Sequence, residues 1–186
     1  MNIYDPYPTE VEYQGKSYRV NLEYDRVLRA LDVQQDKLLT AQDKLIAQIQ
    51  LLLPRPPSTL AECIGVLDKV FHMLPRNEES QERYIDLHQD AAIIRSAFLR
   101  LGIDLLKDKP HFFRFVEVLA DLPSDTALMR IVDIRRRPIP KPTKHNREEI
   151  AELEKLKAKV AIKLSAEEQR DQFLRTLKNS TVMRRG

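Results

Sequence analysis

The sequence predicts a mainly α-helical protein: an N-terminal β-hairpin packed on a compact multi-helix body, followed by a C-terminal helical arm. Three observations support this fold class. Hydrophobic residues make up 42% of the 186 residues and glycines number only 4, which is typical of packed helices. Most of the 11 prolines stand where a helical pattern starts or stops. Only one short stretch, residues 11–21, alternates apolar and polar side chains as strands do.

This stretch, VEYQGKSYRVN, is expected to form a β-hairpin. Val11 and Tyr13 precede a Gln14-Gly15 turn signal, and Tyr18 and Val20 follow it. An isolated two-stranded ribbon is only marginally stable in water. We therefore expect the hairpin to pack its valine and tyrosine side chains on the helical body and to cover part of the core.

Three amphipathic patterns follow the hairpin. Asn21 is the expected N-cap of the first, Thr40 opens the second, which stops at Pro54, and a Thr59–Glu62 capping box opens the third. The third pattern predicts a buried stripe that consists of Leu60, Ile64, Leu67, Phe71 and Leu74. Cys63 and His72 are expected to flank this stripe.

Three further helices are expected before the prolines that begin at Pro138. Residues 86–101 form an amphipathic pattern that Gly102 closes, with an apolar face of Ala91, Ile94, Phe98 and Leu101. Asp108 is the expected start of a helix through HFFRFVEVLADL, and Ser124 is the expected cap of the next one. The body would then contain five or six helices around one core.

The prolines of RRRPIPKPTKHN predict a domain boundary. Residues 1–137 form the expected body, 138–145 an extended linker of polyproline type, and 146–186 a basic arm of two helical segments. Residues 1–134 contain 16 Lys and Arg against 21 Asp and Glu, a net charge of −5, whereas residues 135–186 contain 15 against 7, a net charge of +8. The arm's apolar stripe, Ile150, Leu153, Leu156 (or Lys157) and Val160, is narrow, so the arm should dock on the body or on another chain.

The residue pattern favours a protein without catalytic chemistry. The four histidines stand singly and none is spaced to share a metal with Cys63, so we expect neither metal nor cofactor. Cys63 is expected to be a thiol packed in the core. The sequence contains no phosphate-binding loop and no nucleophile motif. The apolar runs are too short to span a bilayer and the start of the sequence has no signal-peptide pattern, so we expect a cytosolic protein without a membrane partner.

Two groups of side chains are candidates for binding a protein partner. The arginines and lysines around residue 140 could form a basic surface for an acidic protein, although cations at a helix end also stabilise the helix dipole. Nucleic acid is not expected as a partner because no binding module is recognisable. The aromatic run at residues 112–115 cannot bury every ring on one narrow face, so one ring could be an exposed anchor rather than core. The candidate residues are Phe112, Phe113, Arg135, Arg136, Arg137, Lys141 and Lys144.

Three sequence blocks resemble a family of tail assembly chaperones from tailed phages of Gram-positive bacteria, encoded near the tape-measure gene. The blocks are DPYPTEVEYQGKSYRVN, HQDAAIIRSAFLRLGIDL and LADLPSDTALMRIVDIRRRPIPKPTKHNREEIAELEKLKAKVAI. The resemblance runs from about Tyr4 to Leu164. The sequence departs from the family pattern in having Phe112 and Phe113 where tryptophan is expected, and in the charged tail after Leu164.

The resemblance implies a non-catalytic protein of the infected cell's cytoplasm that binds the phage tape-measure protein, with possible homo-oligomers. It would keep that protein soluble until the tail tube polymerises, and would be missing from the mature virion. A structural virion component, such as a head–tail connector or tail-completion protein, would suit the same helical body and basic arm. A nucleic-acid-binding regulator would rest on the charge of the arm alone.

Overall fold

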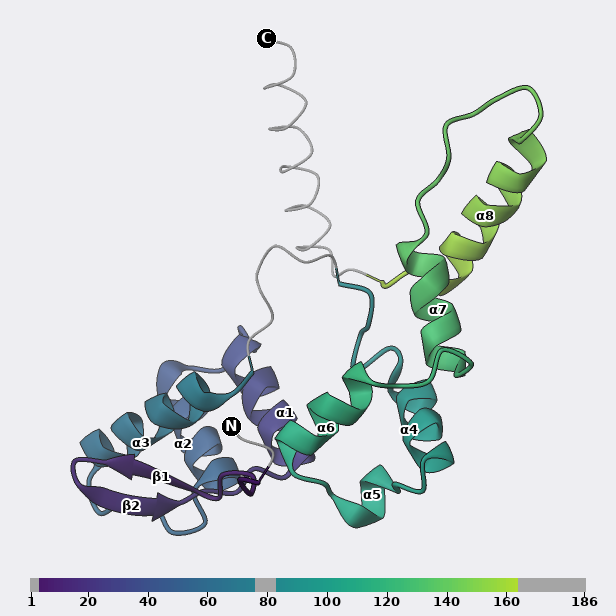
Figure 1. Cartoon of the computed structure of the whole chain (residues 1–186). Coiled ribbons are helices and arrows are strands. Elements are labelled where there is room, and N and C mark those ends of the chain that lie inside the picture. The colour runs from purple at the N-terminus through teal and green to yellow at the C-terminus, as the bar shows by residue number, and fades with distance from the viewer. Residues whose placement is uncertain (1–3, 76–82, 164–186) are drawn as a thin grey trace, which may run out of the picture. The chain divides into compact units, whose positions relative to one another are not determined.

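The computed structural model describes residues 4–75 and 83–163, and it confirms the mainly α-helical fold class (Figure 1). In these residues it contains one two-stranded antiparallel hairpin and eight helices. The second segment of the predicted arm, from Ser165 onward, lies outside the described residues.

The chain folds as two units, not as a single core of five or six helices. The first comprises Met1–Gln81 and Arg95–Leu122, and the second comprises Glu82–Ile94 and Pro123–Gly186. Helix α4 (Ala91–Arg100) supplies residues to both. The predicted division into body, linker and arm at residues 138–145 stays a prediction. Within the second unit, however, the arm helix α8 (Arg147–Val160) packs on α7 (Ala127–Arg136).

The predicted hairpin is confirmed. Strands β1 (Glu10–Tyr13) and β2 (Lys16–Arg19) pair antiparallel, with Tyr13 opposite Lys16. Gln14 and Gly15 between them have φ values of 51° and 73°. Two successive positive φ angles define a type I′ turn, whose twist matches that of the flanking strands.

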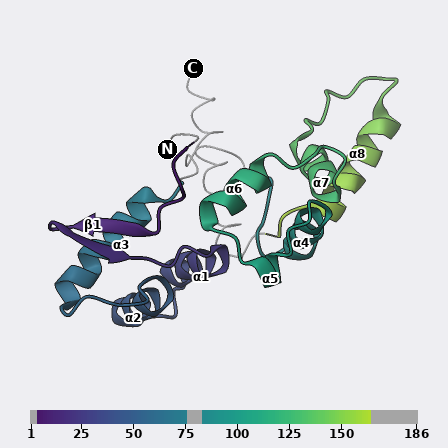
Figure 2. The same ribbon diagram turned by 60° about the horizontal axis from the view of Figure 1, so that its bottom comes forward.

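The hairpin covers α3 (Leu60–Met73), as Figures 1 and 2 show. Val11 and Val20 are buried, at 8% and 5% exposure. The ring of Tyr13 lies so close to Gly65 that a Cβ on Gly65 would collide with it. The hairpin therefore gains its stability from the helix beneath it, as expected.

Two helices begin at the N-cap residues that the sequence predicts. Helix α2 (Ala41–Leu52) begins after Thr40 as expected, and Thr40 forms a capping box with Asp43. At the predicted capping box of α3, the Thr59 hydroxyl accepts from the Glu62 N–H. The expected cap Asn21 is wrong by two residues, because α1 (Tyr24–Gln35) begins after Glu23. The Asn21 side chain instead accepts a hydrogen bond of 3.0 Å from the Glu23 N–H.

The buried face of α3 agrees with the predicted stripe at Leu67 and Leu74 and differs from it elsewhere. Leu60 and Ile64 are 60% and 50% exposed, whereas Cys63, Val66 and Val70 are buried. The helix contacts β1 and α2, so its contacts and not its most apolar stripe decide which side is buried. Cys63 is confirmed as a core thiol, and burial raises the pKa of that thiol.

The segment after α4 forms two helices where the sequence analysis expected one. Asp104 caps the short α5 (Leu105–Asp108), and His111, not Asp108, caps α6 (Phe112–Ala120). A non-local pairing sets this boundary. The Tyr24 N–H donates to the Pro110 carbonyl at 2.9 Å, and the Phe112 N–H donates to the Leu22 carbonyl at 2.7 Å.

In the second unit, α7 is capped by Thr126 and not by Ser124. Thr126 is 2% exposed and its hydroxyl accepts from the Met129 N–H at 3.3 Å. The proline-rich residues 138–142 have no regular secondary structure, as predicted. Among the described helices, none is long and apolar enough to cross a membrane.

Candidate partner-binding surfaces

Phe112, the first candidate anchor, belongs to the aromatic core of the first unit. It is 6% exposed, and its ring centre lies 6.4 Å from that of Phe115. Phe115 in turn lies 5.3 Å from Phe98 and 5.0 Å from Tyr24, ring centre to ring centre. Stacked rings at these distances stabilise a core beyond their buried area. The structure therefore places Phe112 among packing residues and not on the surface.

Phe113, the second aromatic candidate, is half-buried at the edge of a polar and aromatic cluster. The Tyr7 ring stacks on His111 with centres 5.0 Å apart, and Phe113 lies 6.4 Å from Tyr7. The Tyr7 hydroxyl donates to Glu117 at 2.5 Å, and this hydrogen bond is the main reason that the pKa of Tyr7 is raised. The cluster ties the N-terminal segment to α6.

His111 holds this cluster through both ring nitrogens. Nδ1 accepts from the Phe113 N–H at 3.2 Å, which is the cap of α6. Nε2 lies 2.9 Å from the Pro8 carbonyl, which can only accept. Since Nδ1 accepts, Nε2 carries the ring proton and donates it to the Pro8 carbonyl.

Arg135, the first basic candidate, is engaged within the second unit. Its side chain is 7% exposed and forms a two-bond ion pair with Asp90, with Nη1–Oδ2 and Nη2–Oδ1 distances of 2.5 and 2.8 Å. Nη1 also donates to the Tyr84 carbonyl at 2.8 Å, and Nε donates to the Val160 carbonyl at 2.6 Å. One guanidinium thus joins α7, the segment before α4, and the end of α8.

Asp90 is the buried partner of this guanidinium. Desolvation alone would raise the pKa of its carboxyl, but hydrogen bonds from Arg135 and from the Asp86 N–H, with the charge of Arg135, outweigh burial and lower the pKa. Asp86 likewise has a lowered pKa: hydrogen bonds from the Gln89 and His88 N–H groups, with the charge of Arg83, outweigh its desolvation. Both carboxylates are therefore stabilised as anions.

The side chain of Gln89 fastens the chain beyond α8. Its Nε2 donates to the Ala161 carbonyl at 2.9 Å, and its Oε1 accepts from the Lys163 N–H at 2.8 Å. Together with the bond from Arg135 to Val160, these contacts hold residues 160–163 by their backbone. We refer to Gln89 and Arg135 with these hydrogen bonds as the Gln89–Arg135 clamp.

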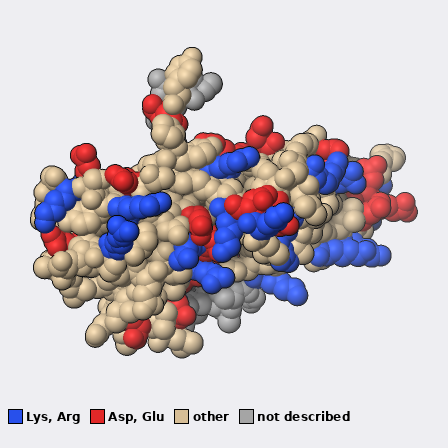
Figure 3. Space-filling view, turned by 90° about the horizontal axis from the view of Figure 1, so that it is seen from below, with Lys and Arg blue, Asp and Glu red and all other residues tan. Residues whose placement is uncertain are grey.

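The remaining basic candidates, Arg136, Arg137, Lys141 and Lys144, are exposed. Arg136 and Arg137 lie at the end of α7, and Lys141 and Lys144 lie in the linker. On the face that Figure 3 shows, lysine and arginine side chains are interspersed with aspartate and glutamate. This face resembles a solvated mixed surface more than a continuous basic patch. The partner-binding role of the candidate residues stays a prediction.

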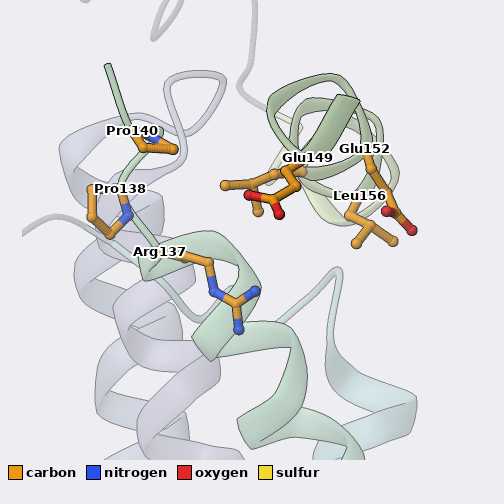
Figure 4. A pocket seen from close by; sticks show the side chains of 7 residues that line it. Arg137, Pro138, Pro140, Glu149, Glu152 and Leu156 are labelled. Atoms are coloured by element: carbon orange, nitrogen blue, oxygen red, sulfur yellow. The ribbon is translucent and has the colours of Figure 1, made fainter. Parts of the chain in front are cut away.

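A pocket of about 540 Å³ lies between the linker and α8 (Figure 4). Arg137, Pro138 and Pro140 form one wall, and α8 forms the other with Glu149, Glu152, Leu153 and Leu156. Leu153 is buried at 9% exposure, whereas Leu156 is 37% exposed. The linker therefore does not seal against the arm helix.

Sequence reasoning missed Asp90 and Gln89. Both belong to the stretch HQDAAIIR, which it interpreted as the interior of one helix. The structure begins α4 at Ala91, and the Asp90 carbonyl accepts from the Ile94 N–H at 2.9 Å. An aspartate before an alanine-rich run is a recognisable helix start. Its ion pair with a residue 45 positions away is not recognisable from sequence.

The described residues hold no group of three or more histidine, cysteine, aspartate or glutamate side chains arranged to bind a metal ion. What the surfaces offer chemically is hydrogen bonding, charge and apolar contact. These are means of recognising another chain.

Comparison with known proteins identifies the family. The chain matches the family described as Bacteriophage Gp15 protein over residues 3–162, which is most of its 186 residues. No match was found to a curated protein or to a solved structure. All three sequence blocks quoted above begin inside the matched region, and the clamp lies in it except for Lys163. The chain is a member of the Bacteriophage Gp15 protein family.

Proposed function

We propose that this phage protein is a non-catalytic tail assembly chaperone. It would bind the tape-measure protein in the cytoplasm of the infected cell, keep it soluble until the tail tube polymerises, and then leave. The observation that carries the proposal is membership of a bacteriophage family across residues 3–162, together with the three blocks that resemble tail assembly chaperones. The described part of the chain also supports the proposal, because some of its helices have apolar side chains at the surface.

Those apolar side chains are suited to transient binding. Leu60 and Ile64 on α3 are 60% and 50% exposed, and Ile46 on α2 is 45% exposed. A tape-measure protein is a long helical client with apolar faces, and an exposed apolar contact can shield such a face. Many copies that each bind weakly can cover the client through avidity and still be displaced by a polymerising tube.

Co-expression tests this function directly. The chain is produced with the tape-measure protein encoded beside it, and the soluble fraction of the tape-measure protein is measured. The proposal expects that this fraction rises and that the two proteins co-purify. An unrelated helical protein expressed at the same level is the control. No gain in solubility and no co-purification would refute the proposal.

Mass spectrometry of purified virions separates a chaperone from a virion component. A chaperone should be missing from mature particles, or present only in traces. A stoichiometric amount would instead show that the chain is a structural part of the particle, such as a connector or tail-completion protein.

A further inference from the structure

Helix α8 buries little of its surface in the second unit. Of its 14 residues, only Leu153 is buried. Ile150 and Val160 are half-buried, and Leu156 is 37% exposed beside the pocket. A lone helix of this length is marginally stable in water, so α8 depends on its packing against α7. A helix with so little buried area should open locally more readily than the rest of the fold.

The contacts that hold residues 160–163, at the end of α8, do not depend on their side chains. The Gln89–Arg135 clamp binds the carbonyls of Val160 and Ala161 and the N–H of Lys163, which every chain except one with proline offers. On the other side, the linker leaves a pocket of about 540 Å³ against α8 instead of packing on it. If α8 left α7, the clamp would present backbone-binding groups to any similar helix.

The contacts of α8 with α7 define the helix that this surface fits. Leu153 supplies the buried side chain. Lys157, one turn later, donates from Nζ to the Arg135 carbonyl at 2.7 Å. That carbonyl lies in the last turn of α7, where carbonyl groups lack helical partners and carry the negative end of the helix dipole. The surface thus fits an apolar residue followed four positions later by a cation.

We propose that α8 is a displaceable lid over α7, and that an amphipathic helix of the client with an apolar residue at position i and Lys or Arg at i+4 takes its place. The identity of the client rests on the proposed function; the lid does not. In the closed state α8 itself occupies the α7 surface. Helices that lack the i and i+4 residues therefore cannot bind there. A client with many such helices outcompetes it by avidity.

Hydrogen exchange on the wild-type protein tests the lid without any client. Amides of residues 151–160 should exchange at least about tenfold faster than those of residues 64–73 in α3, because α8 opens locally. Gln89→Ala should accelerate exchange in α8 and leave α3 unchanged, whereas Gln50→Ala, a change at an exposed glutamine of α2, should alter neither. Exchange of α8 as slow as that of α3 would overturn the lid.

A chemical crosslink tests the docking surface. Pro138→Cys and Glu149→Cys, which lie on opposite walls of the pocket and outside the clamp, are joined in a Cys63→Ser background by a short bismaleimide that keeps α8 beside the end of α7. The same variant treated with N-ethylmaleimide carries two blocked but unbridged cysteines and is the matched control. The tape-measure protein encoded beside this chain is the probe, and its retention on each form is measured.

The control should retain the tape-measure protein and the crosslinked form should lose it. Equal retention by both forms would overturn α7 as the docking surface. If neither form nor the wild-type protein retains it, the proposed function and the docking claim both fail, while the exchange experiment still decides whether α8 is a lid.

Discussion

The ring of Tyr13 lies against Gly65, at the one position of α3 where the helix has no side chain. Gly65→Ala tests this contact. Alanine in a helix is favoured over glycine by about 1 kcal/mol, but its Cβ would meet the ring, and overpacking costs typically 1–3 kcal/mol. We expect net destabilisation in urea unfolding.

The same substitution in a Tyr13→Ala background should change sign and stabilise by up to about 1 kcal/mol, because only the helix preference remains. A stabilising effect of Gly65→Ala in the wild-type protein would contradict the packing of Tyr13 on α3.

Removal of residues 1–21 should destabilise the helices that remain. Val11 and Val20 are buried in the fold, and each large apolar side chain contributes roughly 1.5–3 kcal/mol on burial, so the loss should amount to several kcal/mol. Thermal unfolding followed by circular dichroism measures it. Tyr4→Ala, at a residue that is 89% exposed, should leave the melting temperature unchanged. An unaltered melting temperature after the truncation would show that the hairpin is not part of the core.

Arg135→Ala should destabilise the second unit strongly. It leaves the Asp90 carboxylate buried at 3% exposure without its cation, and breaking a buried ion pair costs about 3–5 kcal/mol. Arg135→Lys should restore only part of the lost stability, because an ammonium group cannot form the two-bond pair with Asp90 and also donate to the Val160 carbonyl. Arg136→Ala, at the exposed neighbour, should stay within about 0.5 kcal/mol of wild type in urea unfolding. Similar effects at both positions would contradict the role of Arg135.

Stability should fall in acid because Asp86 and Asp90 have lowered pKa values in the fold. A depressed carboxyl pKa stabilises the fold above the unfolded value of about 3.9, and this contribution is lost as the pH falls through the folded pKa values. Urea midpoints measured from pH 6 to pH 2.5 should therefore decrease at the acid end. Asp90→Asn should flatten that decrease while lowering the midpoint at pH 6. A variant with the wild-type slope would exclude Asp90 as a source of the acid sensitivity.

Limited proteolysis tests the separability of residues 138–145. Arg137 and Lys141 each precede proline, where trypsin does not cut, so the first cleavage in this segment should follow the exposed Lys144. Removal of residues 144–186 should preserve the transition of the first unit, which contains none of them. It should also lower client binding or oligomer size if the arm mediates association. Loss of the first unit's transition would instead make the arm part of its core.

Several features could be predicted from sequence because their causes are local. The hairpin depends on a two-residue turn and on alternation within eleven residues, and the Thr40 and Thr59 caps act on N–H groups three positions away. That the chain belongs to a phage protein family was also expected from resemblance, and the match over residues 3–162 bears out this coarser statement. Its assignment as a tail assembly chaperone stays a proposal.

Only the tertiary structure decided features that depend on distant partners. The sequence predicted an amphipathic α3 and placed Leu67 and Leu74 correctly on its buried side. The contacts of α3 with β1 and α2 turned that side toward Cys63, Val66 and Val70 instead of Leu60 and Ile64. Arg135 carries the same charge as its neighbours in the sequence. It alone meets a buried carboxylate, because α7 places it beside the start of α4, 45 positions away. A periodic pattern shows that a side chain will be buried or charged, whereas the geometry of the fold decides what it contacts.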